Sequence, residues 1–182
     1  MSMKKDFIVP IIVLAVICLF VSGALAIVNS ITKPVISDAN IERAYAAKKM
    51  IIPQAEEFIK LEIDNLRSEG KIPHSIREIF KTSNNTGFIF NISVRGYGHD
   101  DIKFLCGIDP DGKIIKTEVL AHSETQGLGT PIFEEPHAGK FWGKNLSGIE
   151  DIAAISGATI TSDAFKNGIS DALKAFEIVR SL

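Results

Sequence analysis

The sequence predicts an α+β protein in which an N-terminal transmembrane helix precedes an antiparallel β-sheet domain with covering helices. Three observations predict it: residues 7–28 form a long apolar run without a charge, several segments between residues 88 and 120 alternate apolar and polar side chains, and the C-terminal residues have apolar side chains at helical spacing. The chain has 182 residues, which leaves room for one ordinary domain beside the apolar run.

The apolar run at residues 7–28 predicts an uncleaved single-pass anchor, because at about 1.5 Å per residue it is long enough to cross a hydrocarbon layer of about 30 Å. Lys4 and Lys5 before it, and Ala24 and Ala26 near its end, also fit a cleavable signal peptide. The run exceeds the usual signal core of about 7–15 residues, so an anchor is favoured over a signal peptide, and both over a buried core helix. The charge contrast across the run is small and favours a cytoplasmic N-terminus.

The chain is expected to have three parts: an N-terminal stub and anchor at residues 1–34, a helical stalk or connector at 35–70, and the main domain at 71–182. Within the connector, residues 54–69 have an apolar stripe at Ala55, Phe58, Leu61 and Leu66, and Gly70 is suited to follow a helix end. This pattern predicts a helix over residues 54–69.

The main domain is expected to contain a meander and a final helix. Strands are predicted from residue 88, where Phe88 and Phe90 begin one face, and at 102–108 and 113–120, which the turn at residues 109–112 (Asp-Pro-Asp-Gly) joins into a hairpin. Residues 161–181 have apolar side chains at helical spacing and predict the last helix.

Composition excludes several classes of function. The net charge is −2, without the basic surplus of a nucleic-acid binder. Cys18 and Cys106 are too few for a disulfide framework or a four-cysteine metal site, so any redox chemistry requires a cofactor. Gly96-Tyr97-Gly98 begins like a dinucleotide fingerprint, but Asp101 stands where the third glycine is needed.

The segment 156–162 (Ser-Gly-Ala-Thr-Ile-Thr-Ser), directly before the last helix, is the first candidate site. As a structural element it caps that helix through Thr161 or Ser162. It nevertheless carries more hydroxyl groups than a cap needs, and its small residues allow close backbone approach. Free amides at a helix start bind phosphate well, so a hydroxyl there is suited to hold a phosphate or to be joined to one.

The segment 122–132 (His-Ser-Glu-Thr-Gln-Gly-Leu-Gly-Thr-Pro-Ile), at the end of the second hairpin strand, is the second candidate site. Spacing alone favours a glycine-rich turn. Its position favours binding, because loops at strand ends commonly carry functional groups on a rigid scaffold.

Together the two segments resemble the covalent-FMN-binding domain found in the G subunit of the Rnf electron-transport complex and in the C subunit of the sodium-pumping NADH:quinone oxidoreductase. The resemblance covers nearly the whole chain, including the anchor and the Phe-Trp-Gly-Lys segment at 141–144, and the compact length is closer to the Rnf protein. The chain departs from the family pattern at Ala153, where an acidic residue is usual, and at Gln126, where a proline is usual.

The resemblance implies that residues 71–182 form an FMN-binding domain in which a separate flavin transferase esterifies Thr159 to the FMN phosphate. Glu124, Thr125, Leu128 and Gly129 are expected to line the flavin site without being essential for the covalent bond. The full set of cofactor-binding residues expected beside Thr159 is Ser156, Gly157, Ala158, Ile160, Thr161, His122, Glu124, Thr125, Leu128 and Gly129.

The resemblance also implies an electron-transfer subunit without independent catalytic activity. It would relay electrons between ferredoxin and NAD in a complex coupled to sodium or proton transport, with other Rnf subunits and membrane lipid as partners. The expected location is the cytoplasmic membrane of a bacterium or archaeon, with the FMN domain on the extracytoplasmic side. The alternatives are a stand-alone anchored FMN carrier of another electron-transfer route and a membrane-anchored binding module without redox function.

Overall fold

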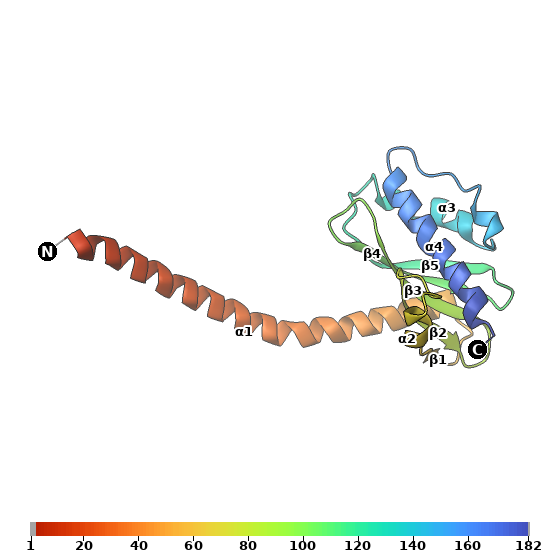
Figure 1. Cartoon of the computed structure of the whole chain (residues 1–182), viewed down its shortest axis with the longest axis horizontal. Helices are drawn as coiled ribbons and strands as arrows, with labels where there is room; N and C mark the ends of the chain where they lie inside the picture. The colour runs from red at the N-terminus through yellow and green to blue at the C-terminus, as the bar shows by residue number, and fades with distance from the viewer. Residues whose placement is uncertain (1–2, 182) are drawn as a thin grey trace. The chain divides into compact units, whose positions relative to one another are not determined.

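The computed structural model describes residues 3–181 and contains one long helix followed by a mixed α and β region (Figure 1). The chain divides into two compact units, residues 1–43 and 44–182. The elements in chain order are α1 (Met3–Ile51), β1 (Phe58–Lys60), α2 (Asp64–Ser68), β2 (Ile76–Thr82), β3 (Phe88–Arg95), β4 (Asp101–Ile108), β5 (Ile114–Ala121), η1 (Thr130–Ile132), α3 (Glu135–Ala138), η2 (Gly139–Phe141), η3 (Ser147–Ile149) and α4 (Thr159–Val179).

The first unit consists of the α1 residues up to Arg43. Within α1, the stretch Ile8–Lys33 contains an 18-residue window with a mean hydropathy of 3.1, and none of that window is buried. An apolar surface of this length is unfavourable in water and stable in a lipid layer. Among the described residues this is the one helix long and apolar enough to cross a membrane, a property that an anchor and a signal sequence share.

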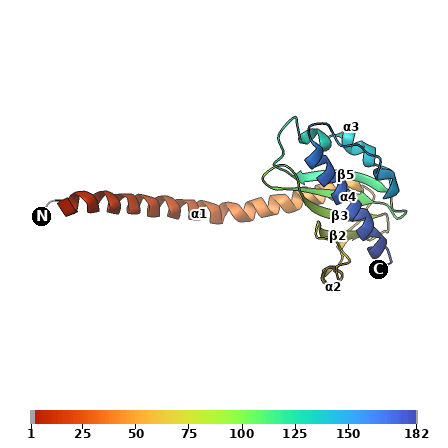
Figure 2. The same ribbon diagram turned by 45° about the horizontal axis from the view of Figure 1, so that its top comes forward.

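The second unit is built on a five-stranded antiparallel sheet with the strand order β1-β2-β3-β4-β5. Each strand pairs with its neighbour in sequence, so the sheet is a simple meander. Helix α4, α3 and the short 3₁₀ turns pack on one face of it (Figure 2). The predicted α+β class, the antiparallel sheet and the covering helices are confirmed.

The main core lies between the sheet and α4. The face of β3 that begins with Phe88 and Phe90 packs against buried α4 side chains that include Phe165, Ile169 and Phe176. This is the face predicted by the alternation of residues 88–95, and Gly112, with φ +80°, completes the predicted hairpin turn.

The opposite face of the sheet has a smaller core, to which the last turns of α1 contribute. Ala47 and Ile51 pack there with Ile89 of β3 and Leu105 of β4. A Cβ at Gly107 would lie 2.2 Å from Ile51 Cγ2, so glycine is required for this close contact between helix and strand.

The predicted helix over residues 54–69 is wrong. Phe58–Lys60 form the edge strand β1, in which Phe58 pairs with Thr82 of β2, and only Asp64–Ser68 are helical. The unpaired edge of β2 offers backbone hydrogen bonds to a distant segment, and these outweigh the local helical spacing. Gly70 does follow the short helix, with φ +71°.

Candidate functional site

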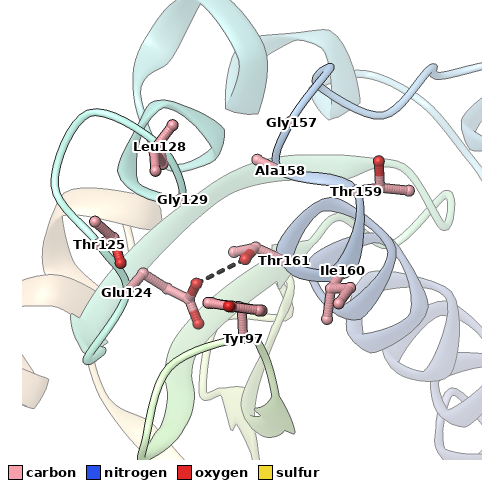
Figure 3. Close-up of a pocket in the computed structure, with 10 residues that line it drawn as sticks. All are labelled: Tyr97, Glu124, Thr125, Leu128, Gly129, Gly157, Ala158, Thr159, Ile160 and Thr161. Atoms are coloured by element: carbon pink, nitrogen blue, oxygen red, sulfur yellow. Dashed lines mark hydrogen bonds between the residues drawn. The ribbon is translucent and has the colours of Figure 1, made fainter.

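Three segments that are distant in sequence meet at one edge of the sheet and line a cavity of about 400 Å³. In an antiparallel meander β3 and β5 run in the same direction, so the segments after Arg95 and after Ala121 leave the sheet at the same edge. The start of α4 lies at this edge too (Figure 3). The lining residues are Tyr97, Glu124, Thr125, Leu128, Gly129, Gly157, Ala158, Thr159, Ile160 and Thr161.

Backbone hydrogen bonds shape the loop after β5. The carbonyl of Thr125 accepts hydrogen bonds from the N–H groups of Leu128 (3.2 Å) and Gly129 (3.0 Å). Gly127 has φ +79°, a conformation that favours glycine, and its N–H donates to Thr130 Oγ1 at 2.9 Å. The resulting tight turn leaves the Leu128 side chain 60% exposed at the cavity.

Glu124 is a buried carboxylate at the centre of the site, with only 8% of its surface exposed. Its Oε1 accepts a hydrogen bond from the N–H of Gly98 at 2.9 Å, and its Oε2 accepts one from the hydroxyl of Thr161 at 2.6 Å. Figure 3 shows Glu124 and Thr161 pointing toward each other across the cavity. A buried carboxylate requires such donors, because its loss of hydration is otherwise uncompensated.

The start of α4 differs from the prediction. The helix begins at Thr159, two residues earlier than expected, and its N-cap residue is Ala158, which makes no side-chain cap. Thr161 and Ser162 are therefore not caps: Thr161 donates to Glu124, and the hydroxyl of Ser162 accepts from the N–H of Ile155 at 3.0 Å. Without a side-chain cap, the amides of the first helical turn are left for a ligand.

The four hydroxyl residues of this segment have different environments. Thr161 and Ser162 are buried and hydrogen-bonded within the protein. Ser156 is exposed but does not line the cavity. Of these four described residues, Thr159 alone is both exposed and part of the cavity lining, so it is the hydroxyl residue that a bound ligand can reach.

The remaining lining suits a ligand that has a phosphate group and an apolar ring system. Tyr97, Leu128 and Ile160 expose 73%, 60% and 58% of their surfaces around the cavity, and they come from all three segments. Such exposed apolar side chains are typical of a binding site, where a planar ring can cover them. The helix start supplies the phosphate-binding end, so the residues present fit FMN.

The structure brings together most of the predicted site residues. Gly157, with φ +83°, and Ala158 lie beside Thr159 in the lining. His122 lies outside it, in a neighbouring polar cavity with Arg95 and His99, and its Nδ1 accepts a hydrogen bond from the N–H of Glu124 at 3.2 Å.

Sequence reasoning missed Tyr97. The Gly-Tyr-Gly segment fails as a dinucleotide fingerprint, and no other motif draws attention to it. The available signal was its position, because a turn directly after the strand at residues 88–95 leaves the sheet at the same edge as the loop after residue 120.

Cys106 contributes no thiol chemistry to the site. It is fully buried in β4, and burial raises the pKa of its thiol to about 12. The thiol is therefore protonated and unreactive at neutral pH.

Comparison with known families finds one that coincides with this region. Residues 96–174 match the model of the FMN-binding domain. The matched range contains all three segments of the cavity, including Tyr97 and Thr159.

Curated relatives match over most of the chain. The G subunit of the proton-translocating ferredoxin:NAD(+) oxidoreductase complex of Clostridium ljungdahlii is 28% identical over 165 residues, which cover 85% of this chain and 84% of that protein. The G subunit of the Na(+)-translocating ferredoxin:NAD(+) oxidoreductase complex of Acetobacterium woodii is 26% identical over 187 residues, covering 91% of this chain and 89% of that protein.

Among solved structures, the C subunit of the Na(+)-translocating NADH-quinone reductase from Parabacteroides distasonis matches with a TM-score of 0.49. The two chains are 18% identical, and the match covers 70% of this chain and 79% of that one.

Proposed function

We propose that this chain is a membrane-anchored flavoprotein subunit of an ion-translocating ferredoxin:NAD oxidoreductase, because residues 96–174 match the FMN-binding domain and the chain is similar over most of its length to the G subunits of such complexes. Its role is to relay electrons through an FMN attached covalently to Thr159. It has no separate catalytic activity of its own.

The observation that carries the proposal is the position of Thr159, an exposed hydroxyl residue that lines the cavity at the start of α4. In the attachment step the Thr159 oxygen would form a bond to the phosphorus of the FMN unit of a flavin dinucleotide and displace the nucleoside monophosphate as the leaving group. The leaving group takes the threonine proton, so the net addition to the chain is FMN less one water. A flavin transferase is expected to perform this step.

The residues around Thr159 would hold the cofactor in distinct ways. The amides of the first α4 turn would hold the phosphate, and the helix dipole would favour the negative charge there. Tyr97, Leu128 and Ile160, which line the cavity, would contact the ring system and exclude water from it. When bound, FMN supplies electron transfer in single or paired steps, and the protein supplies its position and its electrostatic environment.

The attachment is tested by mass spectrometry of the tryptic peptide that spans residues 145–166, from chain produced in a host that contains the transferase. We expect the peptide to be heavier by FMN less one water, with fragment ions that assign the addition to Thr159. An unmodified peptide, or an addition on Ser156 or Thr161, contradicts the proposal.

The apolar stretch Ile8–Lys33 supports a single-pass anchor in the cytoplasmic membrane. The small charge contrast across this stretch favours a cytoplasmic N-terminus, which would place the FMN domain outside the cytoplasm. Protease added to intact spheroplasts is then expected to degrade the domain. Full protection would show that the domain lies on the cytoplasmic side of the membrane. N-terminal sequencing of the mature protein tests the anchor, because a start near residue 25 means a cleaved signal peptide.

Membership of a complex is tested by purification of the tagged chain from its own membranes. We expect the other Rnf-type subunits to copurify with it and with its flavin. A flavinylated chain that purifies alone supports the stand-alone carrier instead.

A further inference from the structure

The buried carboxylate of Glu124 joins all three segments of the cavity. Glu124 itself belongs to the loop after β5, the N–H of Gly98 belongs to the β3–β4 connection, and Thr161 belongs to α4. Both carboxylate oxygens already accept hydrogen bonds from the protein. The side chain is therefore placed to connect the walls of the cavity.

Glycines make room for this carboxylate. A Cβ at Gly96 would lie 2.3 Å from Glu124 Oε1, and a Cβ at Gly129 would lie 2.7 Å from Oε2 and 2.9 Å from the Glu124 Cβ. Any larger residue at either position would displace the carboxylate. The close fit holds one side chain in one orientation, as buried polar groups require.

Thr161 transmits the position of the carboxylate to the reacting group. It is 1% exposed and lies in the first turn of α4, two residues after Thr159. Its hydrogen bond to Glu124 connects that turn to the loop that carries Leu128. The direction of the Thr159 hydroxyl depends on the same turn.

We infer that Glu124 is a positioning residue, which acts through Thr161 to present the Thr159 hydroxyl for attachment of the cofactor phosphate. The inference rests on the proposed function of Thr159. Glu124 does not bind the phosphate, because a carboxylate and a phosphate repel each other. Its role is geometric: it sets the rate of attachment, while the bond itself requires only Thr159.

The first experiment measures the rate at which the full chain gains FMN, by intact mass after mixing with FMN donor and transferase. We expect Glu124→Ala to slow the gain by about tenfold or more, because small misplacements of a reacting group have effects of this size. Glu124→Gln should stay near the wild-type rate, since its carboxamide oxygen accepts from Gly98 and its NH₂ group donates to the Thr161 oxygen.

The partner residue supplies the matching pair of variants. Thr161→Val removes the hydroxyl with little change of shape and should slow attachment as Glu124→Ala does, whereas Thr161→Ser should restore it. The double variant Glu124→Ala with Thr161→Val should be no slower than the slower single variant, because both remove the same contact. Thr117→Val, at a buried threonine of β5, is the control for the substitution itself.

A second measurement does not depend on the cofactor. Hydrogen exchange of the unflavinylated chain should be faster in Glu124→Ala than in wild type over residues 154–166, and unchanged in Glu124→Gln. The inference is overturned if Glu124→Ala gains FMN and exchanges hydrogen at the wild-type rates. It is also overturned if Glu124→Gln gains FMN as slowly as Glu124→Ala, since the charge of the side chain and not its geometry would then control attachment. A wild-type chain that gains no FMN at Thr159 refutes the proposed function, and the exchange measurement still decides the role of Glu124.

Discussion

The two walls of the cavity, the start of α4 and the loop after β5, are built differently. The helix wall presents an exposed hydroxyl at Thr159 beside uncapped backbone amides. The loop wall presents a buried carboxylate at Glu124, enclosed by glycines. The difference shows that the modified group and the positioning group are separate residues with opposite requirements. Thr159 has to be accessible to be modified, whereas Glu124 has to be buried to hold its neighbours in place.

The largest expected effect is on the helix wall. Thr159→Val should abolish covalent FMN, because no hydroxyl remains at the cavity, and should change the free energy of unfolding by less than about 0.5 kcal/mol, as is usual for exposed positions. Intact mass and denaturant unfolding measure the two quantities. Ser156→Ala is the control and should keep the flavin; a Thr159→Val chain that still carries covalent flavin would remove the distinction between the walls.

On the loop wall the next effect is on stability. Gly129→Ala should reduce the free energy of unfolding by about 1–3 kcal/mol, because the new methyl group overlaps the Glu124 Cβ, which cannot rotate away. Gly139→Ala is the matched control, since the nearest atom to its new Cβ lies 3.9 Å away. Urea unfolding of the unflavinylated chain measures both. Equal stability of the two variants would show that the loop is loosely packed.

Thr161 tests the contact between the walls. Thr161→Val should lower the free energy of unfolding by about 1–3 kcal/mol, because it leaves the buried Glu124 oxygen without its hydrogen-bond donor. If Thr161 acted as a helix cap, Thr161→Val would cause a similar loss of stability in wild type and in Glu124→Ala. If Thr161 acts through its hydrogen bond to Glu124, the loss should largely disappear in Glu124→Ala. Unfolding of the two single variants and the double variant distinguishes these two interpretations.

The sequence predicted the elements whose pattern is local. Strand β3 alternates cleanly from Phe88, and α4 has a strong apolar face, so both were predictable. Strand β2 was not, because a bulge between Ile76 and Glu78 breaks its alternation. Strand β1 was mistaken for a helix because its pairing with β2 is nonlocal.

The site was predictable at the level of segments and not at the level of contacts. Both loops that the motifs indicated do line the cavity. The hydrogen bond between Glu124 and Thr161 joins residues 37 positions apart, and no local pattern predicts a pairing of that kind. The same contact explains why the hydroxyl of Thr161, whose sequence position suits a cap, is used elsewhere.

The smallest effect concerns the tuning of the cofactor by the loop wall. Thr125→Ala and Leu128→Ala should leave the flavin attached and shift its reduction potential by about 10–30 mV, where 30 mV corresponds to ~1.4 kcal/mol for a two-electron couple. The physical reason is that both residues line the cavity and control polarity and water around the ring. Redox titration followed by the visible spectrum measures the shift, with Leu146→Ala, an exposed leucine outside the cavity, as the control. If both variants match the control in potential and spectrum, the loop only holds Glu124 in place, and the helix wall alone determines the environment of the cofactor.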